Sequence, residues 1–166
     1  MNLNYQAKPM MGFVEAIKAC FAKYANFKGR ARRSEFWWFY LLNAIVSWCA
    51  SGLVKWKMSK ANELMSQVSL SADFKALEDQ ASSVDTTFYI GIAVIGIIML
   101  VMLLPLLSAH VRRLHDIGKS GHLMWLYLLC GIGGLVPLLM CVQEGKPEAN
   151  AYGESPKYVP NAPKMP

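Results

Sequence analysis

The stretch Gly29-Arg-Ala-Arg-Arg-Ser-Glu-Phe-Trp-Trp-Phe39 passes directly from a cluster of arginines to a band of aromatic side chains. Guanidinium groups stay with water and anionic headgroups, whereas tryptophan is enriched at the interface between headgroups and hydrocarbon. Residues 36–54, which follow the arginines, contain no charged residue. At about 1.5 Å per residue, a helix of that length nearly crosses a hydrocarbon core of about 30 Å. The stretch therefore predicts a chain that enters a bilayer and leaves its basic side in the cytoplasm.

The composition of the whole chain agrees with a membrane protein. Of 166 residues, 54% are hydrophobic and 17% are charged, whereas a soluble domain has about 25% charged residues. The formal net charge is +6, and all five arginines flank apolar runs. Basic residues at such places set membrane topology and meet anionic lipid. We therefore expect membrane lipids as partners, with an anionic phospholipid among them, and we do not expect nucleic acid.

Three apolar runs are long enough to be transmembrane helices. They cover about residues 36–54, 88–109 and 123–142. The third run contains Gly131, Gly133, Gly134 and Pro137. A re-entrant hairpin there would need its irregular backbone buried in protein or in a water-filled cavity, so a plain crossing is preferred.

Residues 10–27 show a different, amphipathic pattern. Phe13, Ile17 and Phe21 recur at helical spacing, with Glu15 and Lys18 on another side. This pattern predicts a helix lying on the membrane surface or packed against the other helices, and both can hold at once. The fold class predicted is an all-α membrane protein with three transmembrane helices preceded by an amphipathic N-terminal helix.

The remaining segments are polar. Residues 1–9 are predicted to be disordered, and residues 143–166 form a proline-rich polar tail with little regular structure. Residues 55–87 form a polar connector, in which a short surface helix or a helical hairpin is plausible. Residues 10–142 then make a single membrane domain. Three crossings with all arginines inside place the N-terminus in the cytoplasm, and the connector and C-terminus outside.

Three motifs together resemble one known family. They are Phe27-Lys-Gly-Arg-Ala-Arg-Arg-Ser-Glu-Phe-Trp-Trp-Phe39, Arg112-Arg-Leu-His-Asp-Ile-Gly-Lys-Ser-Gly121, and Gly145-Lys-Pro-Glu-Ala-Asn-Ala-Tyr-Gly153 followed by Pro156. Their order and spacing resemble the bacterial inner-membrane family catalogued as domain of unknown function 805, over about residues 10–156. The resemblance implies a small multi-helix protein of the inner membrane, and it brings no established activity.

The basic residues of these motifs are the best candidates for a binding site. Their predicted position on one membrane face suggests that they bind anionic lipid headgroups or a phosphorylated ligand, because guanidinium groups match pairs of phosphate oxygens. The residues are Arg30, Arg32, Arg33, Arg112, Arg113 and Lys119. The alternative is that they only set topology and pair internally with Glu35 and Asp116.

The adjacent His115 and Asp116 raise the question of a metal or catalytic site. Neighbouring residues on a helix diverge by about 100°, so they rarely share one ligand. We assign Glu35, His115 and Asp116 to a structural polar network at the cytoplasmic interface. No zinc spacing or nucleotide-binding motif is present in the sequence, so no metal and no cofactor is expected.

Three functions remain, in decreasing order. The first is a non-enzymatic membrane module that binds lipid, a partner membrane protein or a second copy of itself. The second is a small transporter or channel subunit, which would need to oligomerise because three helices enclose little volume. The third is a membrane-interface enzyme that uses His115 and Asp116.

Overall fold

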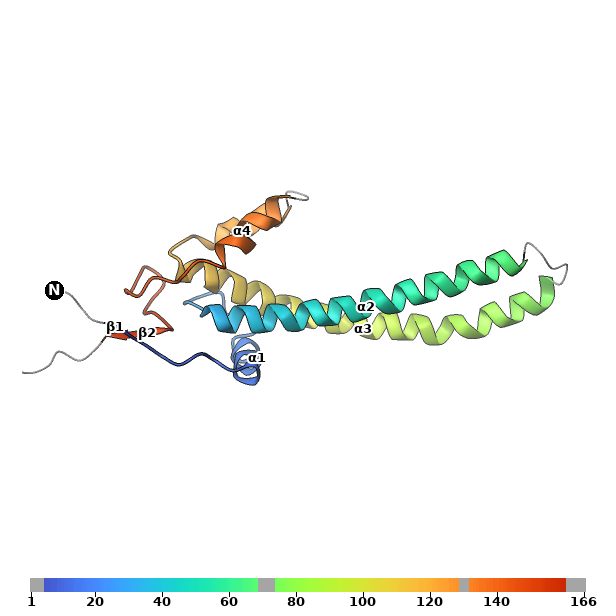
Figure 1. Ribbon diagram of the computed structural model, residues 1–166, viewed down its shortest axis with the longest axis horizontal. Coiled ribbons are helices and arrows are strands. Elements are labelled where there is room, and N and C mark those ends of the chain that lie inside the picture. Colours follow the sequence, from blue (N-terminus) through green and yellow to red (C-terminus); the bar gives the residue numbers. More distant parts are fainter. Residues whose placement is uncertain (1–4, 69–73, 129–131, 161–166) are drawn as a thin grey trace, which may run out of the picture. The chain divides into compact units, whose positions relative to one another are not determined.

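The computed structural model describes residues 5–68, 74–128 and 132–160 and is mainly helical (Figure 1). The elements in chain order are β1 (Tyr5–Ala7), α1 (Phe13–Ala22), α2 (Arg33–Val68), α3 (Phe74–Asp116), η1 (Gly121–Leu128), η2 (Ile132–Gly134), α4 (Leu135–Met140) and β2 (Tyr158–Pro160). The chain divides into two compact units. Unit 1 contains residues 1–41 and 103–166, and unit 2 contains residues 42–102.

Unit 2 consists of the second part of α2 and the first part of α3, which run beside each other (Figure 1). The ammonium group of Lys57 lies 5.2 Å from the centroid of the Phe88 ring, which joins the two helices. Apolar side chains point outward all around these helices, and Trp48, for example, is 78% exposed. A helix that is apolar on every side and not covered by protein is typical of a membrane-spanning helix.

Two helical segments are long and apolar enough to cross a membrane. They are Arg33–Glu63 in α2 and Phe88–Asp116 in α3, and only 6% and 11% of their most apolar windows are buried. These segments include the first two predicted spans, 36–54 and 88–109.

The predicted polar connector, residues 55–87, is largely a continuation of these two helices. Helix α2 runs on to Val68, and α3 already begins at Phe74. The reason is compositional, because residues 55–87 contain neither glycine nor proline and include the helix-favouring residues lysine, alanine, leucine and glutamate. A change from apolar to polar side chains marks the place where a helix leaves a membrane, but this change does not end the helix.

In unit 1, α1 packs against the beginning of α2. The ring of Phe13 meets Trp38 edge to face at 5.6 Å, and Phe21 meets Phe39 in the same way at 5.6 Å. Val14 remains 59% exposed, so α1 also presents an apolar surface. The helix is shorter than the predicted range of 10–27.

The continuous span predicted at 123–142 is not confirmed. The described residues form η1, η2 and α4, short pieces that contact one another. Gly134 allows this close packing, because a Cβ atom there would lie 2.9 Å from Cδ1 of Tyr127. Pro137 falls in the first turn of α4, where its missing N–H needs no partner. Gly131, another of the predicted interruptions, lies outside the described residues.

Two segments predicted to lack regular structure pair with each other. In the antiparallel pair β1–β2, Tyr5 is opposite Pro160, Gln6 opposite Val159 and Ala7 opposite Tyr158. Residues 5–7, in the segment predicted to be disordered, thus form a strand, and the tail predicted to have little regular structure contributes the three residues of β2. Strands of three residues are too short to show an alternating pattern in the sequence.

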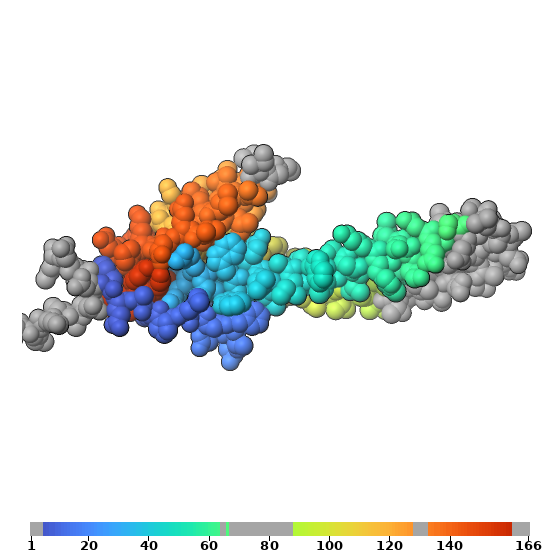
Figure 2. Space-filling view, viewed as in Figure 1, coloured from blue at the N-terminus to red at the C-terminus, as the bar shows by residue number. Residues whose placement is uncertain are grey.

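The strand pair also brings the two ends of the chain together. Figure 2 shows the C-terminal segment, in orange and red, lying against the start of the chain, in blue. Hydrogen-bonded strands cannot sit on opposite sides of a bilayer. The predicted arrangement with the N-terminus inside and the C-terminus outside is not confirmed, and it would separate these two paired strands.

Candidate functional site

The two arginine motifs lie side by side in unit 1. The backbone N–H of Ala31 donates to the carbonyl of Arg112 at 3.0 Å, which joins the segment before α2 to the end of α3. Gly29 starts this segment with a φ of 83°, a left-handed conformation that glycine adopts without strain. The motifs, distant in sequence, thus form one cluster of charged side chains.

Arg30 is buried and all its donor nitrogens have partners. Its Nε donates to Asp116 Oδ1 at 2.9 Å, and both side chains are at most 5% exposed. Its Nη1 donates to the carbonyls of Glu148 at 2.7 Å and Gly153 at 3.2 Å. Its Nη2 donates to the carbonyls of Asp116 and Lys146. Arg30 therefore holds the C-terminal tail against the end of α3.

Asp116 accepts from a second arginine on its other side. Nη1 of Arg113 donates to Asp116 Oδ2, while Nε and Nη2 donate to the carbonyls of Cys141 and Gln143. Both charges are buried, so each needs these partners to offset the loss of water. Asp116 is thus the centre of the cluster, paired with one arginine from each motif.

Arg112 faces away from Asp116 and pairs with Glu35 on α2. Both side chains are buried. Within the described part of the chain, Nε and Nη2 of Arg112 have no hydrogen-bond partner. The thiol of Cys20 on α1 lies beside this pair, 3.8 Å from the Glu35 carbonyl. Burial raises the pKa of the Cys20 thiol to about 12, and the negative charge of Glu35 adds to this increase.

His115 has a different environment from Asp116, although the two are adjacent. Its Nδ1 lies 3.2 Å from the Gly29 carbonyl, which can only accept, so Nδ1 carries the proton. Its ring stacks on Tyr152 with the ring centroids 3.7 Å apart and the planes 2° apart. Asn150 donates to the His115 carbonyl at 2.9 Å. His115 therefore docks the tail, and it does not share a ligand with Asp116.

The other three predicted basic residues lie at the surface of unit 1. Arg32 donates to the carbonyls of Lys8 and Pro9 at 2.9 and 2.8 Å. Arg33 pairs with Glu144 at 3.0 Å, with 42% of the arginine side chain exposed. Lys119 is exposed in the turn after α3. The structure thus divides the six basic candidates into a buried set (Arg30, Arg112, Arg113) and an outer set (Arg32, Arg33, Lys119).

Glu144 belongs to a surface cluster that the sequence did not indicate. Hydrogen bonds from Lys157 and Tyr158 lower the pKa of Glu144 to about 2, and the pKa of Lys157 is raised by the same bond. The Tyr158 hydroxyl donates to Glu144 Oε1 at 2.8 Å. These contacts hold β2 next to the segment that follows α4.

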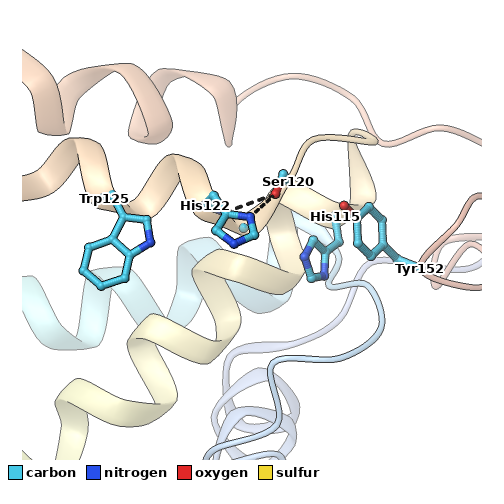
Figure 3. Close-up of a pocket in the computed structure, with 6 residues that line it drawn as sticks. His115, Ser120, His122, Trp125 and Tyr152 are labelled. Atoms are coloured by element: carbon cyan, nitrogen blue, oxygen red, sulfur yellow. Dashed lines mark hydrogen bonds between the residues drawn. The ribbon is translucent and has the colours of Figure 1, made fainter.

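A cavity of about 310 Å³ lies between the end of α3, the beginning of η1 and the tail. It is lined by His115, Ser120, Gly121, His122, Trp125 and Tyr152. Figure 3 shows the His115 and Tyr152 rings stacked face to face, and His122 beside Ser120. Most of these residues were not candidates in the sequence, because single aromatic or hydroxyl residues in a turn carry no motif. Among the described residues, no group of three or more His, Cys, Asp or Glu is placed to hold a metal ion.

The chain is similar to proteins of the Escherichia coli inner membrane. It is 31% identical over 138 residues to the inner membrane protein YhaI of strain K12, covering 83% of this chain and 92% of that protein. It is 30% identical over 140 residues to the inner membrane protein YhaH of the same strain, covering 82% and 92%. A family model described as Protein of unknown function (DUF805) matches residues 24–154. No solved structure matches the chain.

Proposed function

Because the chain belongs to the DUF805 family, with inner membrane proteins as relatives, we propose that it is an integral protein of the bacterial inner membrane. In this proposal it crosses the membrane twice, keeps both ends in the cytoplasm, and binds anionic phospholipid as a non-enzymatic module.

The two crossings correspond to the apolar parts of α2 and α3. The candidate segment of α2, Arg33–Glu63, has 31 residues, and at about 1.5 Å per residue it exceeds a hydrocarbon core of about 30 Å. Its ends therefore extend beyond the hydrocarbon. Two crossings return the chain to the side on which it began, and the pairing of β1 with β2 supports this arrangement.

The arginines support a cytoplasmic position for unit 1. All five stand in unit 1, before the first crossing or after the second, and cytoplasmic segments carry an excess of such residues. The opposite ends of the two helices carry Lys55, Lys57 and Lys60, with acidic residues in the same segment. The stronger excess of basic charge is therefore on the side of unit 1.

The third apolar run and α1 fit the interface between lipid and cytoplasm. Trp125 on η1 is 67% exposed and Leu139 on α4 is 59% exposed, so this folded-back segment has apolar side chains to place in lipid. Val14 gives α1 a similar outer surface. Apolar side chains on an otherwise polar unit are stabilised at the level of the headgroups.

The division of the six basic residues is the observation that carries the lipid proposal. The buried set is engaged by Glu35, Asp116 and tail carbonyls, and it makes the unit rigid. The outer set remains at the surface where the chain enters and leaves the membrane. Arg33 forms an exposed ion pair with Glu144 and donates to the Val142 carbonyl at 3.3 Å. Such an exposed ion pair contributes little to stability and exchanges readily with a phosphate.

The position of His115 supports a non-enzymatic function. Its Nδ1 is bonded to the Gly29 carbonyl, and Asp116 is paired with two arginines. Neither group is arranged to exchange a proton with the other, as a catalytic pair would need to.

The test compares the lipids that purify with the protein. The triple variant Arg32→Gln/Arg33→Gln/Lys119→Gln is expected to lose at least about tenfold in bound phosphatidylglycerol, because each basic residue near an anionic surface contributes about 1 kcal/mol. Bound lipids are measured by mass spectrometry after a mild detergent wash.

A matched control exists at the other end of the long helices. The variant Lys55→Gln/Lys57→Gln/Lys60→Gln removes the same charge and is expected to keep the lipid. Equal retention in both triple variants, or equal loss, would contradict the assignment of lipid binding to the outer set.

A further inference from the structure

The cavity beside η1 has a polar side formed by two histidines and a serine. Ser120 Oγ accepts from the backbone N–H of His122 at 3.3 Å and lies 2.8 Å from His122 Nδ1. When the serine O–H donates to Nδ1, the ring proton of His122 is on Nε2. His122 is exposed at the cavity, so this N–H is a donor for a ligand.

The opposite side of the cavity is rigid and aromatic. His115 and Tyr152 stack at 3.7 Å, and the bond from His115 to Gly29 fixes the orientation of the imidazole. The Nε2 edge of His115 lies against Gly121, since a Cβ atom on that glycine would be 3.3 Å from it. A side chain at position 121 would therefore intrude at the wall of the cavity. Trp125 adds an indole, whose N–H can only donate.

The charges around the cavity favour an anion. None of the described lining residues is acidic. Lys119 immediately precedes the lining residues Ser120 and Gly121 and is exposed. The Lys146 ammonium lies 3.1 Å from the position of a Cβ atom on Gly118, in the turn that leads to the cavity. Donor groups next to lysines, with no carboxylate, match the oxygens of a phosphate group.

The position of the cavity along the chain indicates its depth. The candidate membrane helix in α3 extends to Asp116, beyond its apolar run 88–109, and the next apolar run begins at Leu123. The cavity residues lie between these points, and Trp125 is of the residue type that favours the headgroup level. A volume of about 310 Å³ is at the lower end for small-molecule sites and suits a headgroup-sized ligand.

We propose that this cavity binds the phosphate group of a phosphate ester, carried by a phospholipid headgroup or by a small soluble molecule. The donors are Nε2–H of His122, the indole N–H of Trp125 and the ammonium group of Lys119. The stacked pair His115–Tyr152 forms the wall against which the ligand lies (Figure 3). If the phosphate group belongs to a lipid, this site rests on the lipid-binding function proposed above and assigns lipid binding to a specific place in the protein.

The test uses the full-length protein in an uncharged maltoside detergent, labelled with ¹⁵N and ¹³C at its three histidines. Short-chain dihexanoylphosphatidylglycerol and glycerol 3-phosphate are added separately, and glycerol serves as the control without phosphate. Saturable changes in the imidazole signals of His122, with His110 unchanged, are expected for at least one phosphate compound. The variant His122→Gln identifies the His122 signals.

The two compounds distinguish the two sources. A response to the lipid alone assigns the site to a headgroup, and a response to glycerol 3-phosphate alone assigns it to a soluble ligand. A response to both supports the shared phosphate chemistry. Unchanged His122 signals with both compounds, or changes also produced by glycerol, would overturn the proposal.

The tryptophan provides a matched pair of variants. Trp125→Phe removes the indole N–H and is expected to raise the half-saturation concentration about tenfold, as for loss of a hydrogen bond to a charged group. Trp48→Phe makes the same change on α2 at a residue that does not line the cavity, and it should leave the half-saturation concentration unaltered. Equal half-saturation in the two variants would overturn the cavity as the place of binding.

The double variant Arg32→Gln/Arg33→Gln separates this proposal from the proposed function, because it changes no cavity residue. If it keeps all its phosphatidylglycerol, the lipid function of the outer set fails. The His122 response to glycerol 3-phosphate, measured on the same variant, still decides the cavity proposal. If this double variant has native His115 and His122 signals but His122 no longer responds to glycerol 3-phosphate, the result counts against the cavity as the binding site.

Discussion

Gly145 lies so close to Asp116 that a Cβ atom on the glycine would be 2.6 Å from Cγ of the carboxyl group. The tail passes directly over the carboxylate that binds Arg30 and Arg113. The backbone N–H of Lys146 also donates to the Asp116 carbonyl at 3.1 Å. The first residues of the tail are therefore part of the buried charge cluster.

Gly145→Ala should destabilise unit 1 because the added methyl group displaces either the tail or the carboxylate. Overpacking of this kind costs about 1–3 kcal/mol. A lower melting temperature of the purified protein is the expected result. Gly96→Ala is the control, since a Cβ atom at that helical position has no atom within 4 Å among its described surroundings. Equal melting temperatures for the two variants would contradict the close packing of the tail.

Arg30→Lys should loosen the tail although it keeps the positive charge. A lysine cannot reproduce the fork that reaches Asp116 and the carbonyls of Lys146, Glu148 and Gly153. Limited proteolysis should then cleave within residues 143–160 much faster than in the wild-type protein. Lys28→Gln, at a nearby exposed position, is the control. An unchanged cleavage rate in Arg30→Lys would show that Arg30 does not hold the tail.

Glu35 and Arg112 should behave as a buried pair in a double-mutant cycle. Removal of one partner leaves the other charge buried and unpaired, at a cost of about 3–5 kcal/mol. We expect Glu35→Leu and Arg112→Met each to destabilise the protein strongly, and the double variant to be more stable than either. Chemical denaturation in detergent measures the three stabilities. Strictly additive effects would contradict direct pairing.

Cys20 should react slowly with thiol reagents. Its ionisation should also make the free energy of unfolding depend on pH in the alkaline range. Its pKa is raised from an ordinary 9.0 to about 12 in the folded protein. The neutral thiol therefore favours folding fully below pH 9, and this contribution declines as the pH rises toward 12, because only the unfolded chain then ionises.

The thiolate is the reactive form, so maleimide labelling of Cys20 at pH 8 should be on the order of a hundredfold slower than after unfolding in SDS. Mass spectrometry of the Cys20 peptide measures both rates, and the denatured sample is the internal control. Similar rates before and after unfolding would show that Cys20 is not buried beside Glu35.

Much of the site could be predicted from local sequence. The change from arginines to aromatic residues at 30–39 indicated where α2 begins, and the spacing of Arg113 and Asp116 allowed their pairing within one helical turn. Such signals are local because a helix brings together residues three or four positions apart.

The rest of the cluster depends on contacts that leave no pattern in the sequence. Most partners of Arg30 are backbone carbonyls of the tail, and any residue can supply a carbonyl. The third apolar run was interpreted as a span because hydropathy does not distinguish a crossing helix from short pieces that fold back. The strand pair β1–β2, which places residues 158–160 beside residues 5–7, is formed by two segments of three residues.

The location of the C-terminus tests the account most directly. Green fluorescent protein and alkaline phosphatase can each be fused to the C-terminus, and in a second set inserted after Val68 at the end of α2. Two crossings predict a fluorescent C-terminal fusion with an inactive phosphatase, and an active phosphatase after Val68. An active alkaline phosphatase at the C-terminus would place the two chain ends on opposite sides of the membrane and would contradict the proposed two crossings.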